Sequence, residues 1–187
     1  LARRGRDHRG MLERRGPKIG VITTRGFRDV LEMRRRDRRR TWGLWGDFIP
    51  IADRDMRVEV SERTLADGHV RTPVDPAEVQ AAAKYLLDKG AESIALTFIN
   101  AYANADNERR ALAALRAVWP NEFVTASHEV LSEIREFERS STAAINAYLQ
   151  PVVASYIGKL ETALASQSFP GQLHIVQSNG GIMSTAT

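Results

Sequence analysis

Cysteine is absent from the 187 residues, and this absence excludes disulfide bonds and every metal site built on thiolate ligands. No apolar run approaches the roughly 18 residues that a membrane-spanning helix needs, and no apolar stretch follows the basic N-terminus as it would in a secretory signal. The four histidines lie far apart in the sequence, so no two of them have the spacing of metal ligands. We therefore expect a soluble, cytoplasmic protein whose own side chains form no metal site.

Two glycine-rich nucleotide motifs are also missing. The sequence contains no GxxxxGK[ST] phosphate loop, and no GxGxxG motif follows a predicted strand. This disfavours both a P-loop nucleotide-binding domain and a Rossmann-type dinucleotide domain.

Positive charge is concentrated at one end of the chain. Residues 1–40 hold 15 Lys and Arg against 5 Asp and Glu, a net charge of +10 in a chain whose total is +4. The densest run, residues 34–40, is either a patch that binds nucleic acid or phosphate, or an arginine-rich face or arm that simply contacts water. Because no nucleic-acid-binding motif accompanies the run, we expect no nucleic-acid partner.

The apolar pattern divides the chain into a prefix and a domain. Residues 1–16 are basic and show no apolar periodicity, so we expect a disordered prefix before an α/β region that fills residues 17–187. Strands are predicted at residues 18–23, 57–60, 93–99, 123–126 and 173–177. The elements alternate in β-α-β-α-β order, which predicts a sheet that is at least partly parallel, with flanking helices.

The helices have clear start signals. Asp75, followed by Pro76, predicts the first, and Asp106 begins the second. Residues 134–166 are helix-rich, and Pro151 must begin a new helix there or bend an existing one. Between the strands, a turn at residues 67–68 predicts a hairpin that pairs the strand at residues 57–60 with residues 70–72.

Three polar clusters directly follow predicted strands, which is where open α/β sheets bind ligands. They are residues 24–26, 127–129 and 178–181. Because parallel strands end on the same side of a sheet, we expect all three clusters to lie along one edge.

Each cluster has a functional and a structural interpretation. In the first, Thr24, Arg25 and Gly26 either contact a phosphate or carboxylate, or Thr24 and Asp29 cap a short helix. In the last, the amides of a glycine turn either approach a phosphate or form an ordinary strand-end turn. Its candidate binding residues are Ser178, Asn179, Gly180 and Gly181.

The middle cluster supplies the candidate catalytic residues. His128 is a candidate general base or metal ligand, with Glu129 or Glu133 as the acid beside it, although a lone histidine is also compatible with a structural role. Ser127, at the strand end, and Asn146, on the following helix, are further candidate binding residues. The small polar side chains around Asn146, at Ser140, Ser141 and Thr142, either line a substrate cleft or let helices approach.

Several segments resemble one family, the nucleotide-binding subunit of ATP-dependent hydantoinases, 5-oxoprolinases and acetone-type carboxylases, usually called hydantoinase A. The resemblance covers about residues 11–187. The segments that carry it are GVITTRGFRD from Gly20, ER at Glu62, DG at Asp67, NAY at Asn100, SHEV at Ser127, IREFERSST at Ile134, NAYL at Asn146 and QSNGG at Gln177.

The resemblance implies a fold and a chemistry. The fold would be a partial actin-like ATPase fold with ribonuclease-H-like halves. The activity would be ATP-dependent hydrolysis of a cyclic amide such as a hydantoin or 5-oxoproline, or carboxylation of a ketone, with ATP and Mg²⁺ used to phosphorylate a carbonyl or enol oxygen of a small-molecule substrate. A second subunit of the hydantoinase B type would be the partner.

The chain also departs from the family pattern. The family's glycine-rich phosphate loop is expected before Met11, where residues 1–10 do not match it, and its second phosphate loop is expected beyond Thr187. We therefore expect an internal fragment, truncated at both ends, that is inactive and binds ATP poorly on its own. The alternative is a non-enzymatic module in which the basic arm docks a partner subunit.

Overall fold

The computed structural model describes residues 16–35, 50–168, 171, 173–176 and 181–184. The chain divides into two units, Leu1–Pro151 and Val152–Thr187. The predicted disordered prefix, except for Gly16, and most of the arginine run lie outside the described residues.

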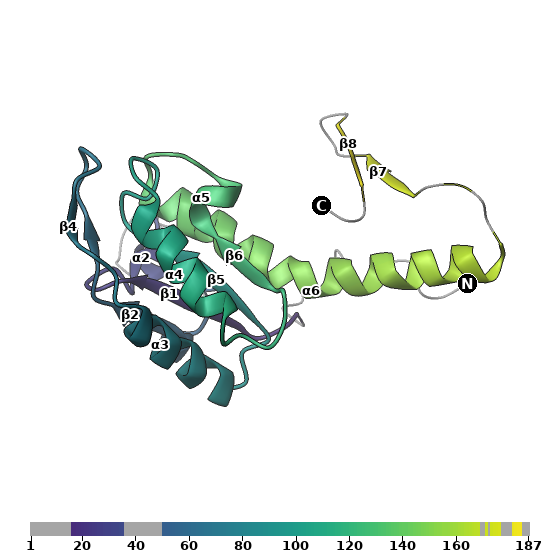
Figure 1. Ribbon diagram of the computed structural model, residues 1–187, viewed down its shortest axis with the longest axis horizontal. Coiled ribbons are helices and arrows are strands. Elements are labelled where there is room, and N and C mark those ends of the chain that lie inside the picture. The colour runs from purple at the N-terminus through teal and green to yellow at the C-terminus, as the bar shows by residue number, and fades with distance from the viewer. Residues whose placement is uncertain (1–15, 36–49, 169–170, 172, 177–180, 185–187) are drawn as a thin grey trace, which may run out of the picture. The chain divides into compact units, whose positions relative to one another are not determined.

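The first unit is built on a four-stranded parallel sheet in the order β2-β1-β5-β6 (Figure 1). Its strands are β1 (Ile19–Thr24), β2 (Arg57–Val60), β5 (Ser93–Thr97) and β6 (Val124–Ala126). Every residue of β1 and β5 is buried, as expected for central strands covered on both faces. The predicted α/β class, with a parallel sheet and flanking helices, is confirmed.

Helices cover both faces of this sheet. On one face, Ile22 and Leu96 pack with the apolar side of α3 (Pro76–Asp88) and α4 (Asp106–Arg116). On the other face, Ile19, Val21 and Ala95 pack against α2 (Val30–Met33) and the alanine-rich start of α6 (Glu136–Ser166). Alternate residues of one strand therefore serve two separate cores, since successive side chains of a strand point to opposite faces.

The helix signals read from the sequence are confirmed for α3. The Asp75 carboxylate accepts a hydrogen bond from the Ala77 amide at 2.9 Å, Pro76 occupies the first turn, and Gly90 follows the helix at φ +84°. The helix predicted to begin at Asp106 is also present as α4.

The hairpin prediction was half wrong. The turn at Asp67 and Gly68 exists, but β4 (Val70–Thr72) pairs antiparallel with β3 (Arg63–Thr64). The strand at residues 57–60 instead joins the main sheet as β2, parallel to β1. Two close strands joined by a turn are the simplest pairing to read from sequence, and the two residues of β3 are too short to produce a periodic signal.

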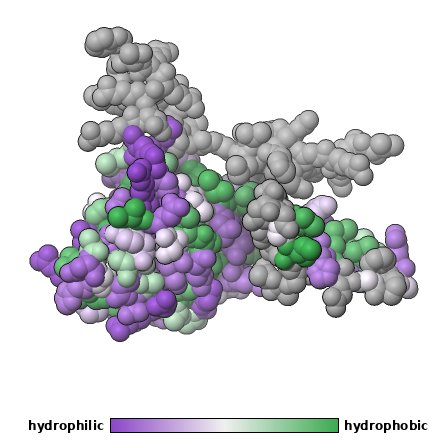
Figure 2. Space-filling model, turned by 90° about the horizontal axis from the view of Figure 1, so that it is seen from above, coloured by the Kyte–Doolittle hydropathy of each residue, from purple (hydrophilic) through white to green (hydrophobic). Residues whose placement is uncertain are grey.

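Two short elements and one long helix complete the first unit. The 3-10 helix η1 (Arg54–Met56) precedes β2, and α5 (Ser127–Val130) follows β6 directly. The helix α6 continues through Pro151, so this proline neither ends the helix nor starts a new one. Hydrophilic residues cover much of the first unit on the face seen in Figure 2.

The second unit contains the end of α6 and a hairpin. Strands β7 (His174–Val176) and β8 (Ile182–Ser184) pair antiparallel, so a strand predicted within residues 173–177 is confirmed. In the part of the chain that the structure describes, no helix is long and apolar enough to cross a membrane.

The cap of α3 gives a first prediction. Replacing Asp75 by Ala removes the acceptor of the Ala77 amide, so the free energy of unfolding should fall by about 1 kcal/mol in a urea titration. Asp88→Ala is the matched control, because this exposed aspartate lies in the last helical turn, where a negative charge is not stabilising. Equal losses in the two variants would contradict the capping role.

Candidate functional site

Polar residues gather at the carboxyl ends of the parallel strands. The register pairs Ile22 of β1 with Leu96 of β5, and Leu96 with Ala126 of β6, so these three strands end on the same side. Thr24 and Ser127 therefore lie along one edge of the sheet, as predicted for the first two polar clusters. The third cluster falls outside the described residues at 178–180, and Gly181 belongs to the second unit.

Glu108, in the first turn of α4, is the centre of this edge. Its side chain is fully buried. One carboxylate oxygen, Oε1, accepts hydrogen bonds from the Phe98 amide at 2.9 Å and from the Ser127 hydroxyl at 2.7 Å. The other oxygen, Oε2, accepts from the His128 amide at 2.9 Å and lies 2.6 Å from the ring nitrogen Nδ1 of His128. Four donors thus surround one buried carboxylate, which satisfies it without contact with water.

This contact fixes the imidazole of His128. A carboxylate can only accept, so Nδ1 carries the proton and donates it, and Nε2 is the ring atom that Glu108 does not engage. The side chain is 12% exposed and forms part of a cavity wall. A general acid–base histidine typically has one ring nitrogen bound to a buried acid, while the other ring nitrogen makes no bond to that acid. His128 has this arrangement.

The cavity beside His128 has a volume of about 430 Å³. Its walls come from the turn of the β3–β4 hairpin, the loop after β5 and the residues around α5. The lining is predominantly polar and consists of Asp67, Gly68, Ala101, Tyr102, Ala103, Asn104, Ala105, Arg109, His128 and Ser132. It suits a small polar molecule rather than an apolar one.

A larger cavity of about 670 Å³ lies between the start of β1, α2 and α6. Its lining contains Tyr148, Phe137 and Ile145 but no histidine and none of the residues at the strand ends. The His128 cavity is therefore the better candidate for chemistry, although it is the smaller of the two.

Thr24 has a structural role in this arrangement. Its hydroxyl donates to Glu62 and accepts the amide of Ile99 at 3.0 Å, and its side chain is buried. The second Glu62 oxygen accepts from Asn107 Nδ2 at 2.8 Å, and Asn107 Oδ1 accepts from the Val74 amide. These bonds tie β1, the loop after β5, the start of α4 and the β3–β4 hairpin together.

Burial raises the pKa of the Glu62 carboxyl above its ordinary value of 4.5, and repulsion by Glu108 adds to the rise. The hydrogen bonds from Thr24 and Asn107 and the charge of Arg63 oppose it. Two buried carboxylates thus lie on one edge, and only Glu108 has a histidine partner.

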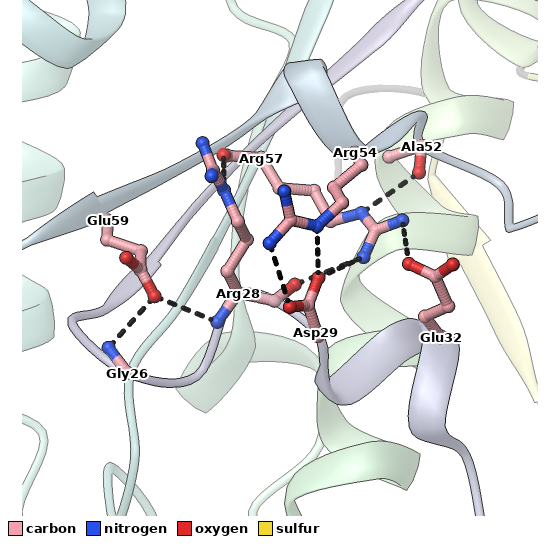
Figure 3. Close-up of polar contacts among 8 residues, drawn as sticks. All are labelled: Gly26, Arg28, Asp29, Glu32, Ala52, Arg54, Arg57 and Glu59. Atoms are coloured by element: carbon pink, nitrogen blue, oxygen red, sulfur yellow. Dashed lines mark hydrogen bonds and ion pairs between the residues drawn. The ribbon is translucent and has the colours of Figure 1, made fainter.

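The glycine turn after β1 already holds an anion from the protein itself. Gly26 has φ +88°, and its amide and that of Arg28 both donate to Glu59 Oε1, at 2.8 and 3.2 Å (Figure 3). A ligand phosphate would have to displace this carboxylate. The exposed Arg25 forms an ion pair with Glu78 at 2.8 Å.

The helix-capping interpretation of this loop was wrong. Asp29 makes no side-chain hydrogen bond to the amides of α2. It binds Arg54 at 3.0 Å and Arg57 at 3.4 Å, and the bond from Arg54 lowers the pKa of Asp29 (Figure 3). Nearby cations attract its carboxylate more strongly than the few amides of a four-residue helix.

Arg57 is the buried member of this group. Its guanidinium donates to the carbonyl of Ala52 at 3.1 Å, to that of Arg28 at 3.2 Å and to Glu32 at 3.1 Å (Figure 3). It therefore holds the loop between β1 and α2 against the start of β2.

Two other predicted site residues lie away from the cavity. Glu129 forms an ion pair with Arg116 at 3.7 Å and is absent from the cavity lining. Adjacent residues of a helix do not face the same way, so the neighbour of His128 in sequence is not its neighbour in space. Asn146, on α6, donates to Thr125 Oγ1 at 3.0 Å and supports β6.

Glu108, Glu62 and Asn107 are site residues whose roles the sequence did not indicate, although Glu62 lies in one of the segments that resemble the family. An acidic residue at position 108 is expected without any site role, because acidic residues stabilise the first turn of a helix. Nothing in its spacing indicated that it would be buried beside His128. In the part of the chain that the structure describes, no group of three or more His, Cys, Asp or Glu side chains could hold a metal ion.

Comparison with known proteins gives a consistent result. Residues 9–119 match the model of the hydantoinase/oxoprolinase N-terminal region, and residues 139–187 match the hydantoinase/oxoprolinase model. The alpha subunit of caprolactamase from Pseudomonas jessenii is 33% identical over 92% of this chain, and the gamma subunit of acetophenone carboxylase from Aromatoleum aromaticum is 29% identical over 91%. The chain spans 25% of the length of each of these two relatives.

A solved structure agrees with the sequence matches. The crystal structure of ATP-dependent caprolactamase from Pseudomonas jessenii superposes with a TM-score of 0.84 at 32% identity. The superposition covers 95% of this chain and 26% of that one. The described α/β arrangement is therefore one that a larger known protein contains.

The contacts of Glu108 give a stability prediction. Glu108→Gln replaces one acceptor oxygen by a donor that faces other donors, so the free energy of unfolding should fall by about 3 kcal/mol in a denaturant titration. Glu129→Gln is the control, because its partner is exposed, and its effect should stay within about 0.5 kcal/mol. Similar losses in both variants would show that Glu108 is not the centre of the edge.

The raised pKa of Glu62 gives a pH prediction. Above the ordinary carboxyl pKa of 4.5, the unfolded chain has lost a proton that the folded chain still binds, so wild-type stability falls as pH rises from there through the folded pKa. Glu62→Gln has no such proton, so chemical unfolding across this pH range should show a smaller fall. Glu122→Gln, at an exposed position, should retain the wild-type profile. Identical profiles for wild type and Glu62→Gln would refute the assignment.

Proposed function

The chain belongs to the hydantoinase/oxoprolinase family, and from this premise we propose that it is the region of an ATP-dependent enzyme that holds His128 beside the reacting carbonyl group of a small-molecule substrate. The observation that carries the proposal is the 2.6 Å contact between His128 Nδ1 and the buried Glu108, on the wall of a polar cavity at the carboxyl edge of the sheet. The substrate class we propose is a cyclic amide, as in caprolactamase or 5-oxoprolinase, with a ketone to be carboxylated as the second choice.

Both reactions need a proton moved close to a carbonyl group. Hydrolysis of a cyclic amide requires a water molecule to lose a proton as it attacks the carbonyl carbon, and the ring nitrogen to gain one as the carbon–nitrogen bond breaks. Carboxylation of a ketone requires loss of the proton on the carbon next to the carbonyl. With Nδ1 bound to Glu108, Nε2 of His128 can accept the proton in either reaction, and the carboxylate of Glu108 stabilises the imidazolium that results.

The other cavity residues would bind and orient the substrate. Ser132 and Tyr102 can donate hydrogen bonds to a carbonyl oxygen or accept one from an amide. Because the cavity of about 430 Å³ is small and polar, it favours compact substrates that carry several hydrogen-bonding atoms.

The role of ATP in this proposal is to phosphorylate the carbonyl or enol oxygen and so make it a good leaving group. The described residues do not by themselves fit a magnesium nucleotide. Arg109 is paired with Asp106 at 3.2 Å, the glycine turn after β1 holds Glu59, and the described residues form no cluster of metal ligands. We therefore derive no step through ATP from this chain, and we place nucleotide binding in other parts of the enzyme.

A partner subunit is part of the proposal. Two relatives are named as subunits, alpha of caprolactamase and gamma of acetophenone carboxylase. We propose that this chain likewise acts with a second subunit, of the hydantoinase B type.

The test is substitution of His128 in the enzyme assembled with its partner subunit. Phosphate release from ATP is measured with caprolactam, 5-oxoproline, hydantoin, acetophenone and acetone as candidate substrates. His128→Gln should lower the substrate-dependent rate by roughly 10²–10⁴-fold, the usual contribution of a general acid–base group.

His69→Gln is the matched control, because His69 is an exposed histidine of the β3–β4 hairpin and does not line the cavity. It should retain the wild-type rate. A substrate-dependent rate that survives His128→Gln unchanged would remove the basis of the proposed function.

A further inference from the structure

Arg139, in the second turn of α6, is a buried cation that the proposed reaction does not use. Its side chain is completely buried. It donates to the carbonyls of Phe98 and Glu133, both at 2.8 Å, and its Nε has no hydrogen-bond partner among the described residues. Within the described part of the chain it forms no ion pair with a carboxylate. A buried charge without a direct counter-ion is costly, so such a group calls for an explanation.

Phe98 supplies that explanation. Its amide donates to Glu108 Oε1 at 2.9 Å, while its carbonyl accepts from Arg139. One buried anion and one buried cation thus hold the two ends of the same residue, with the N–H directed to the negative charge and the C=O to the positive charge. Both ends of the residue are oriented favourably, and Phe98 itself is 1% exposed, so solvent screens the pair little.

The electrostatics agree with this geometry. Burial lowers the pKa of the Arg139 guanidinium. The charge of Glu108 opposes that shift, although the two side chains are not in contact, and so does the charge of Glu136. Arg139 and Glu108 therefore stabilise each other across the backbone of Phe98.

Arg139 also reaches the wall of the His128 cavity. Its guanidinium carbon lies 5.7 Å from the centre of the Tyr102 ring, and Tyr102 lines the cavity. Phe98 directly follows β5 and opens the loop to which Tyr102 belongs. Arg139 is thus connected to the two parts of the site, the His128–Glu108 pair and the loop wall, without lining the cavity itself.

We infer that Arg139 is a positioning residue, whose charge holds Glu108 and the loop at residues 98–102 in the arrangement that His128 requires. The catalytic part of this inference rests on the proposed function, whereas the positioning of Glu108 and Phe98 does not. The two parts are tested separately.

The first test uses NMR spectra of the 187-residue chain and three arginine variants, with a fourth variant, at His128, for assignment. Arg139→Lys keeps the charge and loses the forked donors, Arg139→Gln loses the charge and keeps an amide donor, and Arg135→Gln is the control at an exposed arginine of the same segment. The readouts are the exchange of the Phe98 amide and the nitrogen shifts of the His128 ring, assigned with His128→Gln.

If charge is what matters, Arg139→Gln should speed exchange of the Phe98 amide by about tenfold or more and reduce the population of ring protonated at Nδ1. Arg139→Lys should lie closer to wild type, and Arg135→Gln should match it. Arg139→Gln spectra equal to wild type, or a larger change in Arg139→Lys than in Arg139→Gln, would overturn the inference. If Arg139→Gln does not fold but Arg139→Lys does, the result supports the inference. If Arg139→Lys does not fold but Arg139→Gln does, the result overturns it.

The second test uses the assembled enzyme. Because Arg139 does not line the cavity, Arg139→Gln should lower kcat by about tenfold or more and change KM by less than about threefold, and Arg139→Lys should restore most of kcat. An effect on KM alone would overturn the positioning role. If instead His128→Gln leaves turnover intact, the proposed function fails while the NMR result for Arg139 still stands or falls by itself.

Discussion

The buried carboxylate of Glu108 is the contact on which this edge of the molecule depends. It accepts hydrogen bonds from the end of β5, from the residue that follows β6 and from the ring of His128, while its own backbone belongs to the start of α4. Two segments, the loop after β5 and the start of α5, therefore share one acceptor on α4. Removing this buried acceptor would leave its donors unpaired, which is costly in the protein interior.

The surrounding polar residues follow from the burial of that charge. A carboxylate in a low-dielectric interior needs donors on both oxygens and a cation at moderate distance, and the protein supplies these from Phe98, Ser127, His128 and Arg139. The second buried acid, Glu62, is held differently, by Thr24 and Asn107, and keeps a raised pKa. The two acids therefore have different tasks: Glu108 orients a histidine, whereas Glu62 joins the β3–β4 hairpin to the sheet.

The proposed acid–base role of His128 belongs to a chain of the hydantoinase/oxoprolinase family. The chain spans a quarter of the length of the two relatives named above, and in our proposal nucleotide binding belongs to other parts of the enzyme. The glycine turn after β1 illustrates why a sequence motif alone does not establish a phosphate-binding site. The turn has the backbone of an anion site, but Glu59 of the neighbouring strand occupies its amides.

The sequence by itself determined the order of the main elements. The apolar runs at residues 18–23 and 93–99 predicted the buried strands observed at residues 19–24 and 93–97, and Asp75 with Pro76 predicted the start of α3, because periodicity and capping depend on residues close together in the chain. The sequence also placed His128 at a strand end, on the same edge as Thr24.

Only the tertiary structure decided which charges are buried and which residue is the partner of His128. Sequence proximity favoured Glu129, which is exposed and paired with Arg116, whereas the actual partner, Glu108, comes from another element. Likewise the strand at residues 57–60 was assigned to a hairpin until the sheet showed it parallel to β1. The partner of His128 and the pairing of β2 both depend on contacts between residues 20 or more positions apart. Local spacing in the sequence does not reveal these contacts, because the free energy of burying a charge is set by the atoms around it in space.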